Sequence, residues 1–138
     1  MASVEMKTSV NASAQDVWQI VGDFSKLDKF VAAVSECIAD SSEVGAQRTL
    51  TLHDGAQLVE KLENIDHDAK TLEYSIVSGP LPVANYRSKM EVKETGPDQC
   101  EVHWSSTFDA AGVSEEEAEE IIKGIYSMGF SGLKEIFG

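Results

Sequence analysis

The sequence predicts an α+β fold in which a curved antiparallel sheet of about seven strands wraps around one long C-terminal helix. Apolar and polar residues alternate through most of residues 34–109, and a period of two is typical of strands that bury one face. After Ser114 the apolar residues recur at spacings of three and four, which is typical of an amphipathic helix. One such helix must cover the concave face of the sheet, so the two patterns together predict this architecture.

The chain begins with a predicted strand, and we expect two short helices after it. Residues 2–10 form the strand. Ser13 is a good N-cap for the first helix, Asp16 lies in the first turn where a negative charge suits the helix dipole, and Gly22 ends the helix. The spacing of apolar residues within 24–30 predicts the second short helix.

Six further strands follow in the prediction, separated by residues that favour turns. The expected strands are residues 34–40, 45–53, 56–66, 70–78, 83–95 and 98–109. Breaks such as His53-Asp54-Gly55 and Gly79-Pro80-Leu81-Pro82 contain the residue types that turns prefer. Because the separations are short, we expect antiparallel hairpins.

The last two strands show the alternation most clearly. One face of them carries Tyr86, Ser88, Met90, Val92, Cys100, Val102, Trp104, Ser106 and Phe108. The other face carries charged and polar residues, among them Arg87, Lys89, Glu91 and Lys93. This pattern is typical of strands that have one face toward a core and the other toward solvent.

The final helix has clear start signals and an apolar face. Ser114 and Glu117 form a capping box, and Glu115 and Glu116 lie in the first turn. The apolar positions are Ala118, Ile121, Ile122, Ile125, Met128, Gly129, Leu133 and Ile136. They predict the face that packs on the sheet.

Three glycines, Gly124, Gly129 and Gly132, lie inside this helix. Each costs about 1 kcal/mol of helix stability relative to alanine, so their presence needs a reason. Two interpretations stay open: the small residues leave room for a ligand or a lid, or they allow close packing of the helix on the sheet.

Composition limits the kinds of function. A chain of 138 residues has the usual size of one domain, so we expect a single domain over residues 1–138. With 24 acidic and 11 basic residues the net charge is −13, which argues against nucleic acid or an anionic membrane as the main partner. The sequence has no apolar run long enough to span a membrane and no signal-peptide core, so we expect a cytoplasmic protein, either monomer or dimer.

No pattern predicts a cofactor or a metal ion. Cys37 and Cys100 lack the spacing of metal ligands, and we interpret them as reduced, buried thiols. His53, His67 and His103 are isolated from one another in the sequence. Neither a glycine-rich phosphate loop nor a nucleophile elbow is present.

Arg48, Glu60 and Tyr86 are polar, but each lies in phase with apolar residues of its own strand: Leu50 and Leu52, Leu58 and Leu62, and Met90 and Val92. If all three point inward, Arg48 and Glu60 approach each other across a hairpin, whereas a slip of one residue would place Lys61 beside Arg48. Burial would raise the pKa of an inward carboxylate, and an adjacent arginine would lower it. Such a pair can move protons or anchor the polar end of a ligand.

Three strings carry a resemblance to a known superfamily: Lys29-Phe30-Val31, Tyr74-Ser75-Ile76-Val77-Ser78-Gly79 and Asn85-Tyr86-Arg87-Ser88. Together with the order of elements, they resemble the START/polyketide cyclase–dehydrase-like (SRPBCC) superfamily, which includes the birch-pollen-allergen proteins. The second and third strings are similar to the strand–latch–strand region of plant abscisic-acid receptors. The resemblance covers essentially the whole chain. It implies a helix-grip fold with a cavity for apolar small molecules between the sheet and the long helix.

The sequence departs from the hormone receptors at three places. Ala32 aligns with the lysine that would hold a ligand carboxylate, and the gate loop is shortened to His53-Asp54-Gly55. The latch loop is Pro80-Leu81-Pro82 in place of a basic and polar triplet. We therefore do not expect hormone reception, although a general cavity is compatible with these changes.

The first function that the resemblance implies is binding of an apolar or amphipathic small molecule, such as a lipid or a polyketide-like metabolite. Glu60 and Tyr86 would lie in the cavity. The other expected lining residues are Leu50, Leu52, Leu58, Tyr74, Ile76, Leu81, Val83, Ser88, Trp104, Ile121, Ile125 and Met128.

Two alternatives stay open. The first is an enzyme of the cyclase, dehydratase or isomerase type, with Glu60 as base, Tyr86 as proton donor or orienting hydroxyl, and Arg48 as stabiliser of developing negative charge. These positions are similar to polar cavity residues of plant lachrymatory-factor synthases, but abscisic-acid receptors carry similar residues and catalyse nothing. The second alternative is an interaction module that uses the acidic helix start, residues 115–120, to meet a basic partner.

Overall fold

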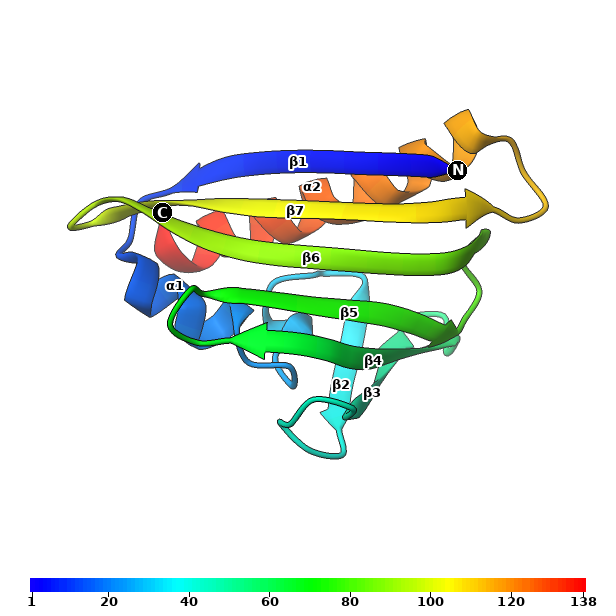
Figure 1. The fold of residues 1–138 in the computed structure, drawn as a ribbon, viewed down its shortest axis with the longest axis horizontal. Coiled ribbons are helices and arrows are strands. Elements are labelled where there is room, and N and C mark those ends of the chain that lie inside the picture. Colours follow the sequence, from blue (N-terminus) through cyan, green and yellow to red (C-terminus); the bar gives the residue numbers. More distant parts are fainter.

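The fold is a seven-stranded antiparallel sheet with one long helix along its inner face (Figure 1). The structure is a computed structural model that describes residues 1–138. The strands are β1 (Ala2–Val10), β2 (Val34–Ala39), β3 (Gln47–Leu52), β4 (Gln57–Asp66), β5 (Thr71–Ser78), β6 (Val83–Gly96) and β7 (Gln99–Ala110). The helical elements are α1 (Ala14–Val21), the 3-10 turn η1 (Leu27–Lys29) and α2 (Glu115–Phe137). The predicted α+β class and order of elements are confirmed.

Successive hairpins build the sheet. Each strand from β2 to β6 pairs with the next one in sequence, and β1 pairs with β7, which gives the order β1-β7-β6-β5-β4-β3-β2. In the turn between β3 and β4, Asp54 Oδ1 accepts a hydrogen bond from the Ala56 amide at 2.9 Å, and Gly55 has a left-handed φ of +88° that favours glycine. In Figure 1, β2 and β3 run at a steep angle to β6 and β7, so the sheet is strongly curved.

Helix α2 begins as its sequence predicts, but its buried face is rotated from the prediction. Ser114 Oγ accepts a hydrogen bond from the Glu117 amide at 3.1 Å. The buried side of the helix consists of Ala118, Ile122, Tyr126, Gly129, Phe130 and Leu133. Ile121, Met128 and Ile136, which the spacing assigned to the apolar face, are at least 37% exposed. The helix has this orientation because Tyr126 and Phe130 pack on the ring of Trp104.

Two of the three helix glycines serve close packing. A Cβ at Gly129 would lie 2.6 Å from the Trp104 ring, and a Cβ at Gly132 would collide with the Phe30 carbonyl. A Cβ at Gly124 would meet nothing within 4 Å. The idea that these glycines leave room for a ligand is therefore wrong for Gly129 and Gly132, since protein atoms fill the space.

The segment between β1 and β2 forms one helix and one shorter turn. Ser13 Oγ accepts a hydrogen bond from the Asp16 amide at 3.1 Å, as the predicted N-cap requires, and α1 ends at Val21 before Gly22. The second predicted short helix is a single 3-10 turn of three residues, Leu27–Lys29. No side chain caps this turn, and it is held by packing of Leu27 in the core.

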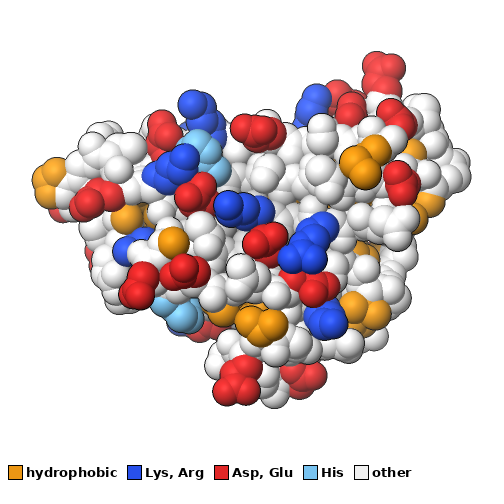
Figure 2. Space-filling view, in the orientation of Figure 1, with side chains coloured by type: hydrophobic (Ala, Val, Ile, Leu, Met, Phe, Trp, Pro, Cys, Tyr) orange, Lys and Arg blue, Asp and Glu red, His pale blue; other side chains and the backbone are white.

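The two faces of the sheet differ as the alternation predicts. Tyr86, Ser88, Met90 and Val92 of β6 are all buried, whereas Arg87 and Lys89 are exposed. Figure 2 shows the outer face of the sheet, where basic and acidic side chains are interspersed. No helix of the structure is both long enough and apolar enough to cross a membrane.

Candidate ligand-binding cavity

A cavity of about 250 Å³ lies between the inner face of the sheet and the first half of α2. Residues from β2 to β7, from α2 and from the segment around η1 surround it, and 15 of the 17 lining residues are hydrophobic. The lining consists of Leu27, Val31, Ala33, Val34, Leu50, Leu52, Leu58, Glu60, Tyr74, Ile76, Pro80, Leu81, Tyr86, Trp104, Ile121, Ile122 and Ile125. This composition is typical of sites that take apolar small molecules.

The structure brings most of the predicted lining together. Leu50, Leu52, Leu58, Glu60, Tyr74, Ile76, Leu81, Tyr86, Trp104, Ile121 and Ile125 all line the cavity. Val83, Ser88 and Met128 do not. Ser88 points inward but lies behind the Trp104 ring and Tyr126, to which it is hydrogen bonded. Met128 lies further along α2, where its sulfur is 3.2 Å from the Ala33 amide nitrogen.

Sequence reasoning missed the lining residues that come from irregular segments. Leu27, Val31 and Ala33 belong to the segment around η1, and Pro80 belongs to the loop between β5 and β6; Val34, also missed, is the first residue of β2. These segments have no regular period from which an inward face could be read. Ile122 was on the predicted apolar face of the helix, and its place beside Ile121 could have been inferred.

Arg48 and Glu60 form a buried ion pair behind the cavity. The β3–β4 register places them directly opposite each other, which is the pairing that the sequence left open. Arg48 Nε donates to Glu60 Oε1 at 2.8 Å. Arg48 Nη2 lies 2.6 Å from the same oxygen, but the angle of this contact is not that of a hydrogen bond. Their side chains are only 3% and 5% exposed. Glu60 lines the cavity, whereas Arg48 does not.

Aromatic rings and a carbonyl hold the guanidinium of Arg48 in place. It stacks 4.1 Å from the ring centroid of Phe24 and 5.0 Å from that of Tyr74, and Nη1 donates to the Phe24 carbonyl at 3.1 Å. Cation–π contacts of this kind are stronger when they are desolvated. Arg48 is therefore fixed, and it fixes one oxygen of Glu60.

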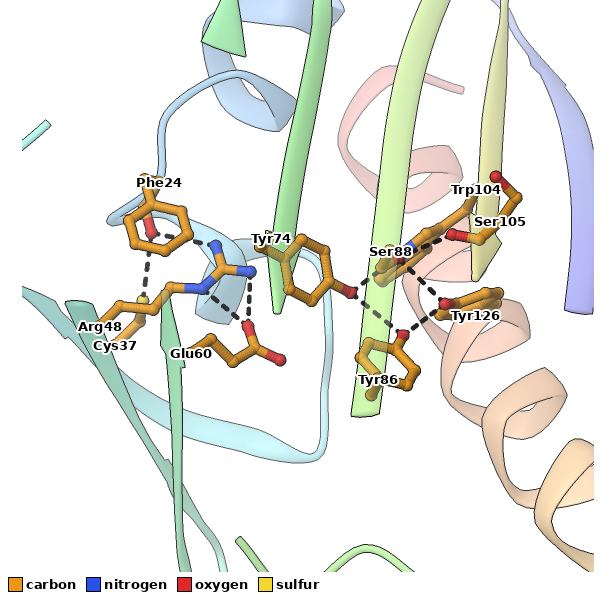
Figure 3. A network of polar contacts seen from close by, with 10 residues as sticks. All are labelled: Phe24, Cys37, Arg48, Glu60, Tyr74, Tyr86, Ser88, Trp104, Ser105 and Tyr126. Carbon is orange, nitrogen blue, oxygen red and sulfur yellow. Dashed lines mark hydrogen bonds and ion pairs between the residues drawn. The ribbon is translucent and has the colours of Figure 1, made fainter. Parts of the chain in front are cut away.

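The second oxygen of Glu60 has no hydrogen-bond partner in the protein. In Figure 3 it points away from Arg48. Burial raises the pKa of Glu60 above its usual value, and the charge and hydrogen bond of Arg48 act in the opposite direction. A carboxylate in this setting can accept a hydrogen bond, or a proton, from a molecule in the cavity.

Three tyrosines form a hydrogen-bonded chain next to this carboxylate (Figure 3). The hydroxyls of Tyr74 and Tyr86 are 3.4 Å apart, and that of Tyr86 contacts the hydroxyl of Tyr126. The hydroxyl oxygens of Tyr126 and Ser88 are 3.1 Å apart. Burial raises the pKa of Tyr74 and of Tyr86 well above the usual value, so both stay neutral hydroxyls. Tyr126 was not predicted, because the helix spacing chosen for the apolar face passed over it.

The histidines and cysteines lie apart from the cavity. His53 Nε2 is 2.8 Å from the Ala32 carbonyl, His67 accepts from Trp18 Nε1 at 3.1 Å, and His103 pairs with Glu101. No group of three His, Cys, Asp or Glu side chains is arranged to hold a metal ion.

The family assignment agrees with this geometry. A family model described as polyketide cyclase / dehydrase and lipid transport matches residues 1–138. The chain belongs to this polyketide cyclase/dehydrase family.

Solved and curated relatives are consistent with membership of the polyketide cyclase/dehydrase family. The protein XoxI of Bacillus cereus has a solved structure that is 33% identical, with a TM-score of 0.93 over 99% of this chain and 96% of that one. The abscisic acid receptor PYL6 of Arabidopsis thaliana is 32% identical over 95 residues, which are 64% of this chain and 44% of the receptor. For the receptor PYL2 the match is 29% over 90 residues, 62% of this chain and 47% of that one. The chain thus spans about half the length of the curated relatives it matches.

The three segments at which the sequence was expected to depart from hormone receptors have defined positions in the structure. Ala32 is exposed and does not line the cavity. The short His53-Asp54-Gly55 turn also lies outside the lining, although Leu52 before it is included. In the latch loop, Pro80 and Leu81 contribute apolar surface to the cavity.

Proposed function

We propose that this protein binds an apolar or amphipathic small molecule, such as a lipid or a polyketide-like metabolite, between its sheet and α2. The observation that carries the proposal is the cavity of about 250 Å³ with 15 hydrophobic residues among its 17. Transfer of apolar surface from water into such a site is favourable by roughly 25 cal/mol per Å². The family description, which includes lipid transport, supports the same function.

The exposure of the lining residues indicates where a ligand enters. Ile121 on α2 is 37% exposed and Pro80 in the β5–β6 loop is also exposed, yet both line the cavity. The inner residues Leu50 and Trp104 are each 1% exposed. The mouth therefore lies between α2 and the β5–β6 loop, and the Glu60 carboxylate lies on the inner wall.

Native mass spectrometry of freshly purified protein tests the proposal, with two variants of one strand. Ile76 of β5 lines the cavity, and its neighbour Val77 is 51% exposed on the outer face. We expect a bound small molecule on the wild type and on Val77→Trp, and its loss from Ile76→Trp, because the larger ring fills the cavity. Retention of the same molecule by Ile76→Trp would contradict binding at this site.

A second candidate function is proton transfer by Glu60, in an enzyme of the cyclase, dehydratase or isomerase type. The free Glu60 oxygen beside the cavity and its raised pKa favour this candidate. Arg48 would act as a positioning residue, since it contacts Glu60 and does not line the cavity. Tyr86 would serve as an orienting hydroxyl.

Glu60→Gln separates binding from catalysis. A positioned base contributes about 10²–10⁴-fold, so turnover of any polyketide-like or sulfenic-acid substrate found in a screen should fall by that factor in Glu60→Gln. Circular dichroism and the ligand affinity of the same variant serve as controls. Unchanged turnover in a folded Glu60→Gln protein would exclude Glu60 as the base.

A further inference from the structure

The hydrogen bonds behind the cavity have a fixed direction, which follows from counting hydrogens. Ser88 Oγ donates its one hydrogen to the Ser105 carbonyl at 2.9 Å, because a carbonyl oxygen can only accept. Ser88 must therefore accept in its other contacts, from Trp104 Nε1 at 3.0 Å and from the Tyr126 hydroxyl at 3.1 Å. The hydrogen of Tyr126 is thus committed to Ser88.

The same count continues along the tyrosines. Because Tyr126 donates its hydrogen to Ser88, Tyr86 must be the donor in the hydrogen bond between the Tyr86 and Tyr126 hydroxyls. Tyr74 must then donate to Tyr86 at 3.4 Å, and it accepts from Trp104 Nε1 at 3.1 Å. Every hydroxyl hydrogen of the chain is used within the protein.

The inner wall of the cavity therefore offers hydrogen-bond acceptors to a ligand and no hydrogen-bond donors. Tyr74 and Tyr86, which line the cavity, each keep one lone pair, and the free oxygen of the Glu60 carboxylate adds more. Two buried polar atoms, Arg48 Nη2 and Ser106 Oγ, have no hydrogen-bond partner, but neither residue lines the cavity. The indole N–H of Trp104 is shared between Tyr74 and Ser88.

We propose that the ligand carries a hydrogen-bond donor, a hydroxyl or an N–H group, at the end of an apolar body, and that the site selects against acids, ethers and ketones. This inference rests on the proposed binding function and specifies its ligand class. A donor satisfies the Glu60 oxygen and the tyrosine lone pairs. A carboxylate would meet only acceptors and a second negative charge in a buried site, which is unfavourable.

Three naphthalenes of similar size test the inference by isothermal titration calorimetry at neutral pH: 2-naphthol, 2-methoxynaphthalene and 2-naphthoate. We expect 2-naphthol to bind about tenfold or more tightly than the ether, because a hydrogen bond to a charged acceptor is gained, and the carboxylate to bind most weakly. Equal or tighter binding of the ether or the carboxylate would overturn the inference and leave cavity binding intact. If none of the three binds at millimolar concentration, the proposed binding function fails as well.

Two Tyr→Phe variants provide a matched control for the direction of the hydrogen bonds. Tyr126→Phe removes the acceptor of Tyr86, so one hydrogen, on Tyr86 or Tyr74, becomes free to face the cavity. The ratio of the affinity for 2-naphthol to the affinity for 2-methoxynaphthalene should therefore be smaller in this variant than in the wild type. Tyr74→Phe also deletes one buried hydroxyl and its lone pair at the cavity, but it frees no hydrogen because that of Tyr86 stays on Tyr126. The preference should therefore fall less in Tyr74→Phe than in Tyr126→Phe. An equal effect of the two variants on the ratio of affinities would contradict the proposed direction.

Discussion

Glu60 uses one oxygen for the fold and leaves the other at the cavity. Oε1 is held by Arg48, whose guanidinium packs against the rings of Phe24 and Tyr74, and both side chains of the pair are buried. Buried ion pairs often contribute little to stability compared with apolar residues of similar size, because both charges lose their hydration. We therefore interpret the pair as a device that positions a carboxylate at the inner wall.

The stability of paired variants tests that interpretation at the residue scale. Arg48→Met alone leaves a buried carboxylate without a partner and should lower the free energy of unfolding by about 3–5 kcal/mol. The double variant Arg48→Met/Glu60→Leu should recover most of this loss in urea denaturation, while losing affinity for 2-naphthol. A double variant that is no more stable than Arg48→Met would show that the pair itself stabilises the fold.

The raised pKa of Glu60 makes a separate prediction about pH. Burial lifts this pKa above the ordinary value of 4.5, so between 4.5 and the higher folded value the folded protein holds more protons than the unfolded chain. The free energy of unfolding of the wild type, minus that of Glu60→Gln, should therefore fall as pH rises through this window. Asp23 and Glu101, whose pKa values are lowered, occur in both proteins and cancel in the difference. A difference that is flat or rises with pH would contradict a raised pKa.

At the scale of the element, α2 combines tight packing near its C-terminal end with open surroundings near its middle. Gly129 touches Trp104 closely, whereas Gly124 faces open space. Gly124→Ala should stabilise the protein by up to about 1 kcal/mol through helix propensity. Gly129→Ala should destabilise it by roughly 1–3 kcal/mol, because the added methyl group displaces the indole ring. Thermal unfolding of the two variants measures both effects, and a stabilised Gly129→Ala protein would refute the packing account.

The elements were predictable because each has a local cause. The N-cap at Ser114 and the turn at Gly55 act within a few residues, and period-two alternation follows from strand geometry. The segment around η1 was less predictable, because its single 3-10 turn depends on packing of Leu27 and not on a local signal. The prediction of which face of α2 is buried was wrong for a similar reason, because the stacking of Tyr126 on Trp104 is a long-range contact.

The candidate site was predictable only in part. The alternation of apolar and polar residues correctly predicted that Arg48, Glu60 and Tyr86 point inward, and all three are buried. Alternation alone cannot show whether an inward-pointing side chain lines a cavity or packs against another side chain. Ser88 was therefore assigned to the lining, although Trp104 and Tyr126 cover it. The tyrosine chain needs three elements to meet, β5, β6 and α2, and no local pattern encodes that meeting.

At the scale of the whole molecule, the curl of the sheet creates the cavity. β2, β3 and the segment around η1 close one side, and α2 covers the sheet along β1 and β7 (Figure 1). The tight contacts of Gly129 and Gly132 fill the space under the C-terminal half of the helix, so the hollow remains only toward its N-terminal half. Its apolar lining and the acceptors on its inner wall together define the ligand that we propose.

The most direct test of cavity binding is nuclear magnetic resonance of the protein labelled at the isoleucine δ1 methyl groups, with 2-naphthol added. Ile76, Ile121, Ile122 and Ile125 line the cavity, whereas Ile38 and Ile136 are 60% and 43% exposed outside it. We predict intermolecular nuclear Overhauser effects from the ligand to the four cavity methyl groups and none to Ile38 or Ile136. Contacts to Ile38 or Ile136 without contacts to the cavity methyl groups would contradict the proposal that the ligand binds between the sheet and α2.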